Sequence, residues 1–181
     1  MQLYQTYMAH QLACLRGNAV PAGSRPALMD SRTLGMCRDA WKNHVRHVKS
    51  SGMQLSVLQA LRDAGYQCRS EHMVGRGLFC VDIGLLHSSS TRVVVEVDGP
   101  HHYSRNDVTK PLGDQLLRNR LLRALGFALV CVPGHQWLSL EDEAQRHNFL
   151  TCLVEEAVAE HRTKQISDQT VSYVESISNH S

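Results

Sequence analysis

The sequence has 181 residues and a formal net charge of +2, and 43% of its residues are hydrophobic. This length suits one domain with a sizeable core plus an extension. Its apolar runs are shorter than the roughly 18 residues of a membrane-spanning helix, so we expect no membrane partner. Its six cysteines lack C-x-x-C spacing, which argues against a zinc knuckle or a redox pair.

Residues 1–50 are predicted to form a helical extension. Apolar residues at helical spacing between Tyr4 and Leu15 indicate a short helix that stops at Gly17, and a linker follows around residues 18–32. A second apolar stripe, from Leu34 to Val48, predicts another helix. Four cations lie beside this stripe and are either phosphate contacts or a solvated helix face: Arg38, Lys42, Arg46 and Lys49.

Residues 51–160 are predicted to form the main domain. A capping box at Ser51 and Gln54 begins a helix that stops at Gly65. Three strands joined by turns follow, at about 66–74, 78–86 and 92–97. After a polar loop at 101–111 comes a helix from about Leu112 to Leu125, and the apolar run 127–132 is then a fourth strand.

The last helix is predicted to run from near Ser139 to about Glu160, and the polar tail 161–181 is expected to be loosely held. The order from residue 51 to residue 132 is therefore α-β-β-β-α-β. We expect the α/β class, with a small mixed β-sheet flanked by helices.

Carboxylates interrupt two of the buried strands. Asp82 lies within one strand, and Glu96 and Asp98 lie near the end of the next, so they converge if the two strands pair antiparallel. Convergent carboxylates suit Mg²⁺ bound to a phosphate substrate. The alternative is a structural network in which arginines of the following helix, such as Arg118, or the loop histidines pair with the acids.

The runs "VDIGLL", "VVVEVDGPHHYSRN" and "LGDQLLRNRLLRALGFALVCVPGHQWLSL" resemble a RAP domain, an RNA-binding domain abundant in apicomplexans. The core of the resemblance covers residues 79–140, and the preceding helix extends it back to Ser51. Trp137 of the last run is expected to pack over the end of the sheet.

RAP domains are similar to the PD-(D/E)xK nucleases, above all to the very-short-patch repair endonucleases, so the resemblance implies a restriction-endonuclease-like core. It would make Asp82 and Glu96 the metal ligands, with assistance from Asp98 or from His101 or His102. Asp98 stands where the general nuclease motif has lysine. This departure favours a fold that binds RNA without cleaving it.

The resemblance further implies an organellar ribonucleoprotein: a mitochondrial ribosome component, or a factor in ribosome assembly or RNA processing. Residues 1–29 contain Arg16 and Arg25 and no acid, which is a faint feature of mitochondrial presequences. RNA and ribosomal or other ribonucleoprotein subunits are the partners expected. No cofactor is expected, although Mg²⁺ is possible at the acids.

Three hypotheses follow. The first is a non-catalytic RNA-binding module whose contacts include the four cations of the extension and a second group: His101, His102, Tyr103, Arg105, Lys110, Arg118, Arg120 and Arg123. The second is a metal-dependent endonuclease acting on RNA or DNA through Asp82, Glu96, Asp98 and His101. The third is a scaffold that contacts RNA mainly through its N-terminal helices and its tail.

Overall fold

The computed structural model describes residues 4, 6–8, 30–45, 50–75, 77–86, 91–99, 103–104 and 107–178. Within these ranges, the side chains of residues 44–45, 103–104, 107–111 and 167–178 are not described. The elements in chain order are α2 (Ser31–Val45), α3 (Gly52–Asp63), β1 (Cys68–Val74), β2 (Phe79–Leu85), β3 (Val93–Asp98), β4 (Tyr103–Ser104), β5 (Asp107–Pro111), α4 (Gly113–Ala124), β6 (Ala128–Pro133), α5 (Gly134–Ser139) and α6 (Glu143–Ser178).

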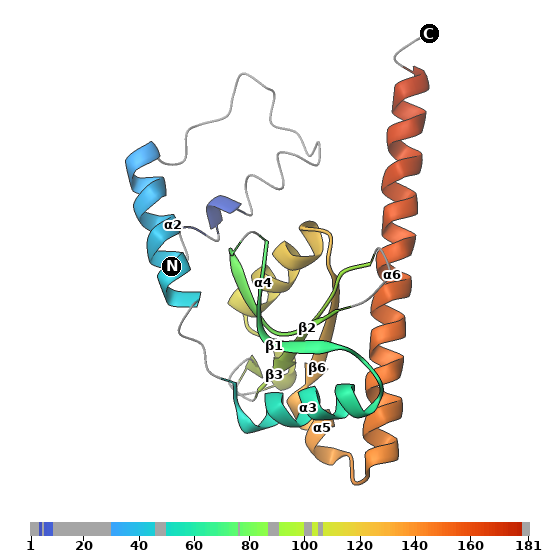
Figure 1. Cartoon of the computed structure of the whole chain (residues 1–181). Coiled ribbons are helices and arrows are strands. Elements are labelled where there is room, and N and C mark those ends of the chain that lie inside the picture. Colours follow the sequence, from blue (N-terminus) through green and yellow to red (C-terminus); the bar gives the residue numbers. More distant parts are fainter. Residues whose placement is uncertain are drawn as a thin grey trace.

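The main sheet has the strand order β1-β2-β3-β6 (Figure 1). β1, β2 and β3 form an antiparallel meander, and β6 pairs parallel to β3 after the crossover through α4. The predicted α-β-β-β-α-β order and the mixed sheet are therefore confirmed. β6 lies at one edge of this sheet, because its pairing partner β3 continues to β2 on the other side.

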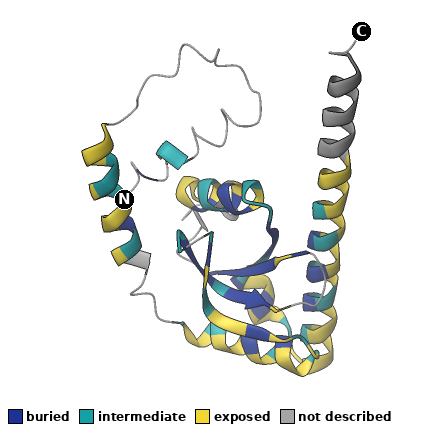
Figure 2. Ribbon diagram, turned by 45° about the horizontal axis from the view of Figure 1, so that its top comes forward, coloured by how far each residue is buried: buried dark blue, intermediate teal, exposed yellow. Residues whose placement is uncertain are grey.

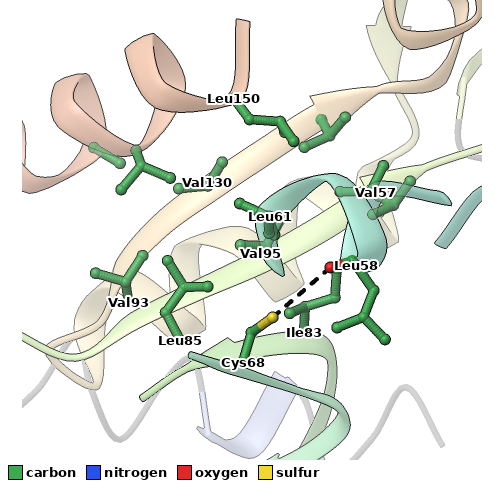
Figure 3. Close-up of a cluster of buried hydrophobic side chains, with 14 of the residues drawn as sticks. Val57, Leu58, Leu61, Cys68, Ile83, Leu85, Val93, Val95, Val130 and Leu150 are labelled. Atoms are coloured by element: carbon green, nitrogen blue, oxygen red, sulfur yellow. Dashed lines mark hydrogen bonds between the residues drawn. The ribbon is translucent and has the colours of Figure 1, made fainter. Parts of the chain in front are cut away.

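One face of the sheet is covered by α3 and α6. Val57 and Leu61 of α3 and Leu150 of α6 are fully buried against the valines of β3 and β6 (Figure 3). The predicted capping box begins α3, since the Gln54 amide donates to Ser51 Oγ at 3.2 Å and the Gln54 side chain accepts from the Ser51 amide. Apolar spacing and a satisfied N-terminus together explain why this segment is helical.

The opposite face is covered by α4 and by the helical extension. Leu121 and Leu122 of α4 are buried there, and so is Trp41 of α2. Figure 2 shows that α4 combines buried and exposed positions. The Trp41 indole packs edge-on against the Phe79 ring, with 6.0 Å between centroids, and its N–H donates to the Leu78 carbonyl. Trp41 therefore attaches the extension to the sheet as an aromatic side chain with a satisfied polar atom, and Tyr4 is buried in the same cluster.

Three predictions of local structure were wrong. The expected loop after β3 contains a hairpin of β4 and β5, where Val108 and Thr109 favour extended backbone. The short helix α5 was missed. The last helix, predicted to end near Glu160 before a loosely held tail, continues to Ser178, because the sequence after Gly134 contains no glycine or proline to end it.

Much of the predicted N-terminal helix and linker lies outside the described residues, although Tyr4 and residues 6–8 are helical. α2 begins at Ser31, where Asp30 accepts hydrogen bonds from the backbone and side chain of Thr33. Among the described residues, no helix combines the length and the apolar character required to cross a membrane.

Candidate functional site

The acidic residues of β2 and β3 lie where these two strands separate. The paired register of β2 and β3 ends at Ile83 and Val95. Beyond that point the Val97 amide donates to Asp82 Oδ2 at 2.7 Å. A side-chain carboxylate thus replaces the backbone acceptor that a continued ladder would supply, and it keeps the buried amide satisfied.

Arg118 of α4 reaches into this separation from the helix side. Its Nη2 lies 2.9 Å from Glu96 Oε1, and its Nε lies 3.1 Å from Glu96 Oε2. The same Nη2 donates to the Cys80 carbonyl on β2, and the guanidinium carbon lies 5.7 Å from the Phe79 ring centroid. One guanidinium therefore joins a helix to two strands by charge-assisted hydrogen bonds.

Asp98 is held by a second set of α4 side chains. Gln115 donates from Nε2 to Asp98 Oδ1 at 2.7 Å and to Asn119 Oδ1 at 3.4 Å. Asn119 in turn donates to the Cys131 sulfur on β6 at 3.4 Å. Asp98, Gln115 and Asn119 are all buried, so this face of α4 meets the sheet through a hydrogen-bonded polar layer.

Burial governs the protonation of the acids. It raises the pKa of Glu96 to about 7, although the Arg118 guanidinium opposes this and the nearby Asp82 carboxylate adds to it. Burial also raises the pKa of Asp82, against the hydrogen bond from the Val97 amide. Burial acts to lower the pKa of Arg118, but the charge and the hydrogen bond of Glu96, together with the nearby Asp82 carboxylate, raise it above its ordinary value.

The geometry around these acids does not fit a divalent cation. Both Glu96 oxygens accept from Arg118, and an oxygen of Asp82 and one of Asp98 accept from an amide and from Gln115. A metal ion placed between Asp82 and Glu96 would meet the Arg118 guanidinium, which already pairs with both oxygens of Glu96. In the part of the chain that the structure describes, no three histidine, cysteine or acidic side chains are grouped to hold a metal.

The sequence reasoning missed three members of this network. Gln115 and Asn119 share a helical stripe with Arg118 at spacings of three and four residues. The spacing is visible in the sequence, but these residues are polar and the helix was assigned from its apolar residues. Glu71 of β1 was missed because its strand carries no motif. Its carboxylate accepts from Ser50 Oγ at 2.7 Å and from the Cys80 sulfur at 3.4 Å, at a residue with φ of 46°.

The structure places the predicted RNA-contacting residues differently. Arg120 and Arg123 are exposed on α4, whereas Arg118 is turned inward to Glu96 instead of pairing with Asp114 on its own helix. On α2, Arg38 and Lys42 are described and lie at least partly in solvent. His101, His102, Arg105, Arg46 and Lys49, together with the side chains of Tyr103 and Lys110, lie outside the described part of the chain.

Trp137 packs in the core as expected. Trp137 lies in α5 and is 2% exposed. The Arg146 guanidinium carbon lies 5.5 Å from its ring centroid. A base cannot stack on a ring that is covered in this way. Trp137 therefore stabilises the end of the sheet.

Comparison with known proteins gives a family match for part of the chain. The family model of the RAP domain matches residues 95–151, from the end of β3 to the start of α6. A protein of Oryza sativa subsp. japonica described as "RAP domain-containing protein, chloroplastic" is 31% identical over 101 residues, or 56% of this chain. The match spans only 15% of that relative's length. Residues 95–151 are therefore assigned to a RAP domain, and Glu96, Asp98, α4 and β6 all lie within these matched residues, whereas Asp82 precedes them.

Proposed function

We propose that the chain is a non-catalytic RNA-binding protein of an organellar ribonucleoprotein. The RAP domain supports RNA as the ligand, and the chloroplastic relative supports an organelle as the setting. The bidentate pairing of Arg118 with Glu96 is the observation that supports RNA binding without catalysis. In this arrangement the acids of the strand end serve the packing of α4 on the sheet.

A nuclease of the kind weighed above would require its acids to be available to a metal ion and to water. Glu96 is 4% exposed and Asp98 is 3% exposed, and each accepts a hydrogen bond from α4. Freeing them would leave the Arg118 guanidinium buried without its partner, at a cost of several kcal/mol. The endonuclease alternative, with Mg²⁺ at Asp82 and Glu96, therefore stays a prediction that no contact of the described residues favours.

The proposed RNA-contacting surface centres on α4. Arg120 and Arg123 supply exposed cations that can neutralise phosphates. Arg38 and Lys42 of α2, attached to the sheet through Trp41, can add to this surface. The histidines 101 and 102 and Tyr103 remain candidate partners for unpaired bases.

The finer proposal places the protein in mitochondria, as a ribosomal component or as a factor of ribosome assembly or RNA processing. The family resemblance and the arginines Arg16 and Arg25 in an acid-free N-terminal stretch support it. Fractionation of cells that express the tagged chain tests the compartment. Sequencing of RNA bound to the tagged protein then separates ribosomal RNA, expected for a ribosomal component, from a single transcript.

The decisive test of RNA binding uses the full purified chain and fluorescently labelled RNA. We expect affinity that falls with rising salt, because cations that contact phosphates release bound counterions. Affinity too weak to measure for single-stranded and duplex RNA alike would refute the proposal. Incubation of the same RNA with Mg²⁺ or Mn²⁺ tests the alternative, since cleavage that Asp82→Asn abolishes would make the protein an endonuclease.

A further inference from the structure

A groove lies between α4 and α6 beside the edge strand β6. Its volume is about 730 Å³, within the range of ligand-binding sites. α4 covers one face of the sheet and α6 covers the other, so the two helices approach each other only around this edge (Figure 1). The groove is thus a product of the tertiary arrangement.

Both walls of the groove carry positive charge. α4 contributes Arg120 and Arg123, three residues apart on the helix, and α6 contributes Lys164, three residues after the imidazole of His161. Glu160 is the one carboxylate among the described residues that line the groove, and it forms an exposed ion pair with Lys164 at 2.6 Å. Exposed ion pairs of this kind contribute little, so Lys164 can exchange that partner for a phosphate.

The groove also presents apolar surface. Leu116 lines it on the α4 side and is 52% exposed. Phe127, directly before β6, lines it too, but it is 5% exposed and the Arg92 guanidinium carbon lies 4.7 Å from its ring centroid. An exposed apolar side chain such as Leu116, with cations on both helices, suits an unpaired nucleic-acid strand, whose bases need contact and whose phosphates need charge. A duplex keeps its bases paired and presents a convex backbone, so it cannot fill the same groove.

The buried polar layer fixes the orientation of the α4 wall. Asn119 belongs to both features, since it accepts from Gln115, donates to Cys131 and lines the groove. The inward position of Arg118 and Asn119 leaves Arg120 and Arg123 on the outer side of the helix. The acidic strand end therefore positions the cations of the groove.

We propose that a single-stranded RNA segment binds lengthwise in the α4–α6 groove, with its phosphates on Arg120, Arg123 and Lys164. This rests on the proposed RNA-binding function and names its principal site. Residues 161–165, which the sequence placed in a loosely held tail, become part of the binding surface.

The test compares two double variants of the full chain by fluorescence anisotropy with a labelled single-stranded RNA and with its duplex. The groove variant is Arg120→Gln with Lys164→Gln. The control is Arg69→Gln with Arg162→Gln, which removes the same charge from exposed positions of β1 and α6 outside the groove. We expect the groove variant to lose about tenfold in single-strand affinity and its salt slope to fall by about 1.4, and the control to change little.

The outcomes separate this proposal from the function on which it rests. If the unaltered chain binds neither RNA, the proposed function fails and the groove fails with it. If it binds RNA and both double variants lose affinity equally, only the groove is overturned. Equal loss of duplex affinity in the groove variant refutes the preference for a single strand, and displacement of the RNA by polyglutamate at equal charge refutes RNA as the occupant.

Discussion

Arg118 and Glu96 form a buried bidentate ion pair between α4 and β3, with N–O distances of 2.9 and 3.1 Å. The same guanidinium donates to the Cys80 carbonyl of β2, and Asp82 accepts from the Val97 amide of β3. The side chains of Arg118 and Asp82 thus replace backbone hydrogen bonds at the point where β2 and β3 separate. The acidic strand end is a joint between the sheet and its crossover helix.

Arg118→Met is expected to lower the free energy of unfolding by about 3–5 kcal/mol, because it leaves the Glu96 carboxylate buried without its partner. Urea denaturation measures the loss. Arg120→Met on the same helix is the matched control, since Arg120 is exposed and its loss should leave the midpoint nearly unchanged. Equal midpoints for the two variants would contradict the structural role of Arg118.

The double variant Glu96→Leu with Arg118→Met is expected to recover most of that loss. Two apolar side chains of similar volume can replace a buried ion pair at little cost, because neither ion then has to be desolvated. A double variant as unstable as Arg118→Met alone would show that the contact of Arg118 with Cys80, and not its pairing with Glu96, is what matters.

Stability is expected to fall as the pH rises from about 4.5 to about 7 on account of Glu96. Its pKa in the folded protein is about 7, against an ordinary value of 4.5, so the folded state binds the proton more tightly. That contribution is complete below pH 4.5 and is lost as the pH rises through 7. Denaturation midpoints at pH 5, 6, 7 and 8 measure the trend, which should be weaker in Glu96→Gln. An identical pH profile in that variant would overturn the assignment.

Gly84→Ala is expected to destabilise the sheet by about 1–3 kcal/mol. A Cβ at this position of β2 would lie within 3.0 Å of three atoms of the His72 side chain on β1, which therefore has to move. Adding His72→Ala removes the obstructing ring and should restore much of the loss. If the second substitution makes the protein less stable still, the close approach of these two residues is not the cause.

Trp41→Ala is expected to release α2 from the sheet, because truncation of a buried tryptophan costs about 3–5 kcal/mol. Limited trypsin digestion should then cut faster at Arg38 and Lys42, while the Trp137 fluorescence of the core stays unchanged. Trp41→Phe retains a ring against Phe79 and should protect α2 far better. Equal digestion of the two variants would show that α2 is held by other contacts.

The secondary structure was predictable where apolar spacing was regular. The valines of β3, the apolar run of β6 and the leucines of α3 specified their elements and the α-β-β-β-α-β order. The same reasoning placed Asp82, Glu96 and Asp98 on neighbouring strands. It failed for the end of α6, where a polar composition suggested a loose tail although no residue there ends a helix.

The buried face of α4 shows what a hydrophobic pattern cannot decide. Leu112, Leu116, Leu121 and Leu125 are spaced to share one helical face, but Leu112 and Leu116 are 40% and 52% exposed. Gln115, Arg118 and Asn119 point inward in their place, because the strand end opposite presents carboxylates that must be satisfied. Which face of α4 is buried depends on the strands that it packs against. The spacing of residues within one segment contains no information about those strands.

The sequence by itself determined the order of helices and strands along the chain and the presence of acids at one strand end, since these follow from local spacing along the chain. Only the tertiary structure decided what the acids do. Packing brings Arg118 onto Glu96 across 22 residues of sequence, and it brings α6 beside α4 to form a cationic groove. Both depend on side chains from distant segments meeting in space, which local spacing does not encode.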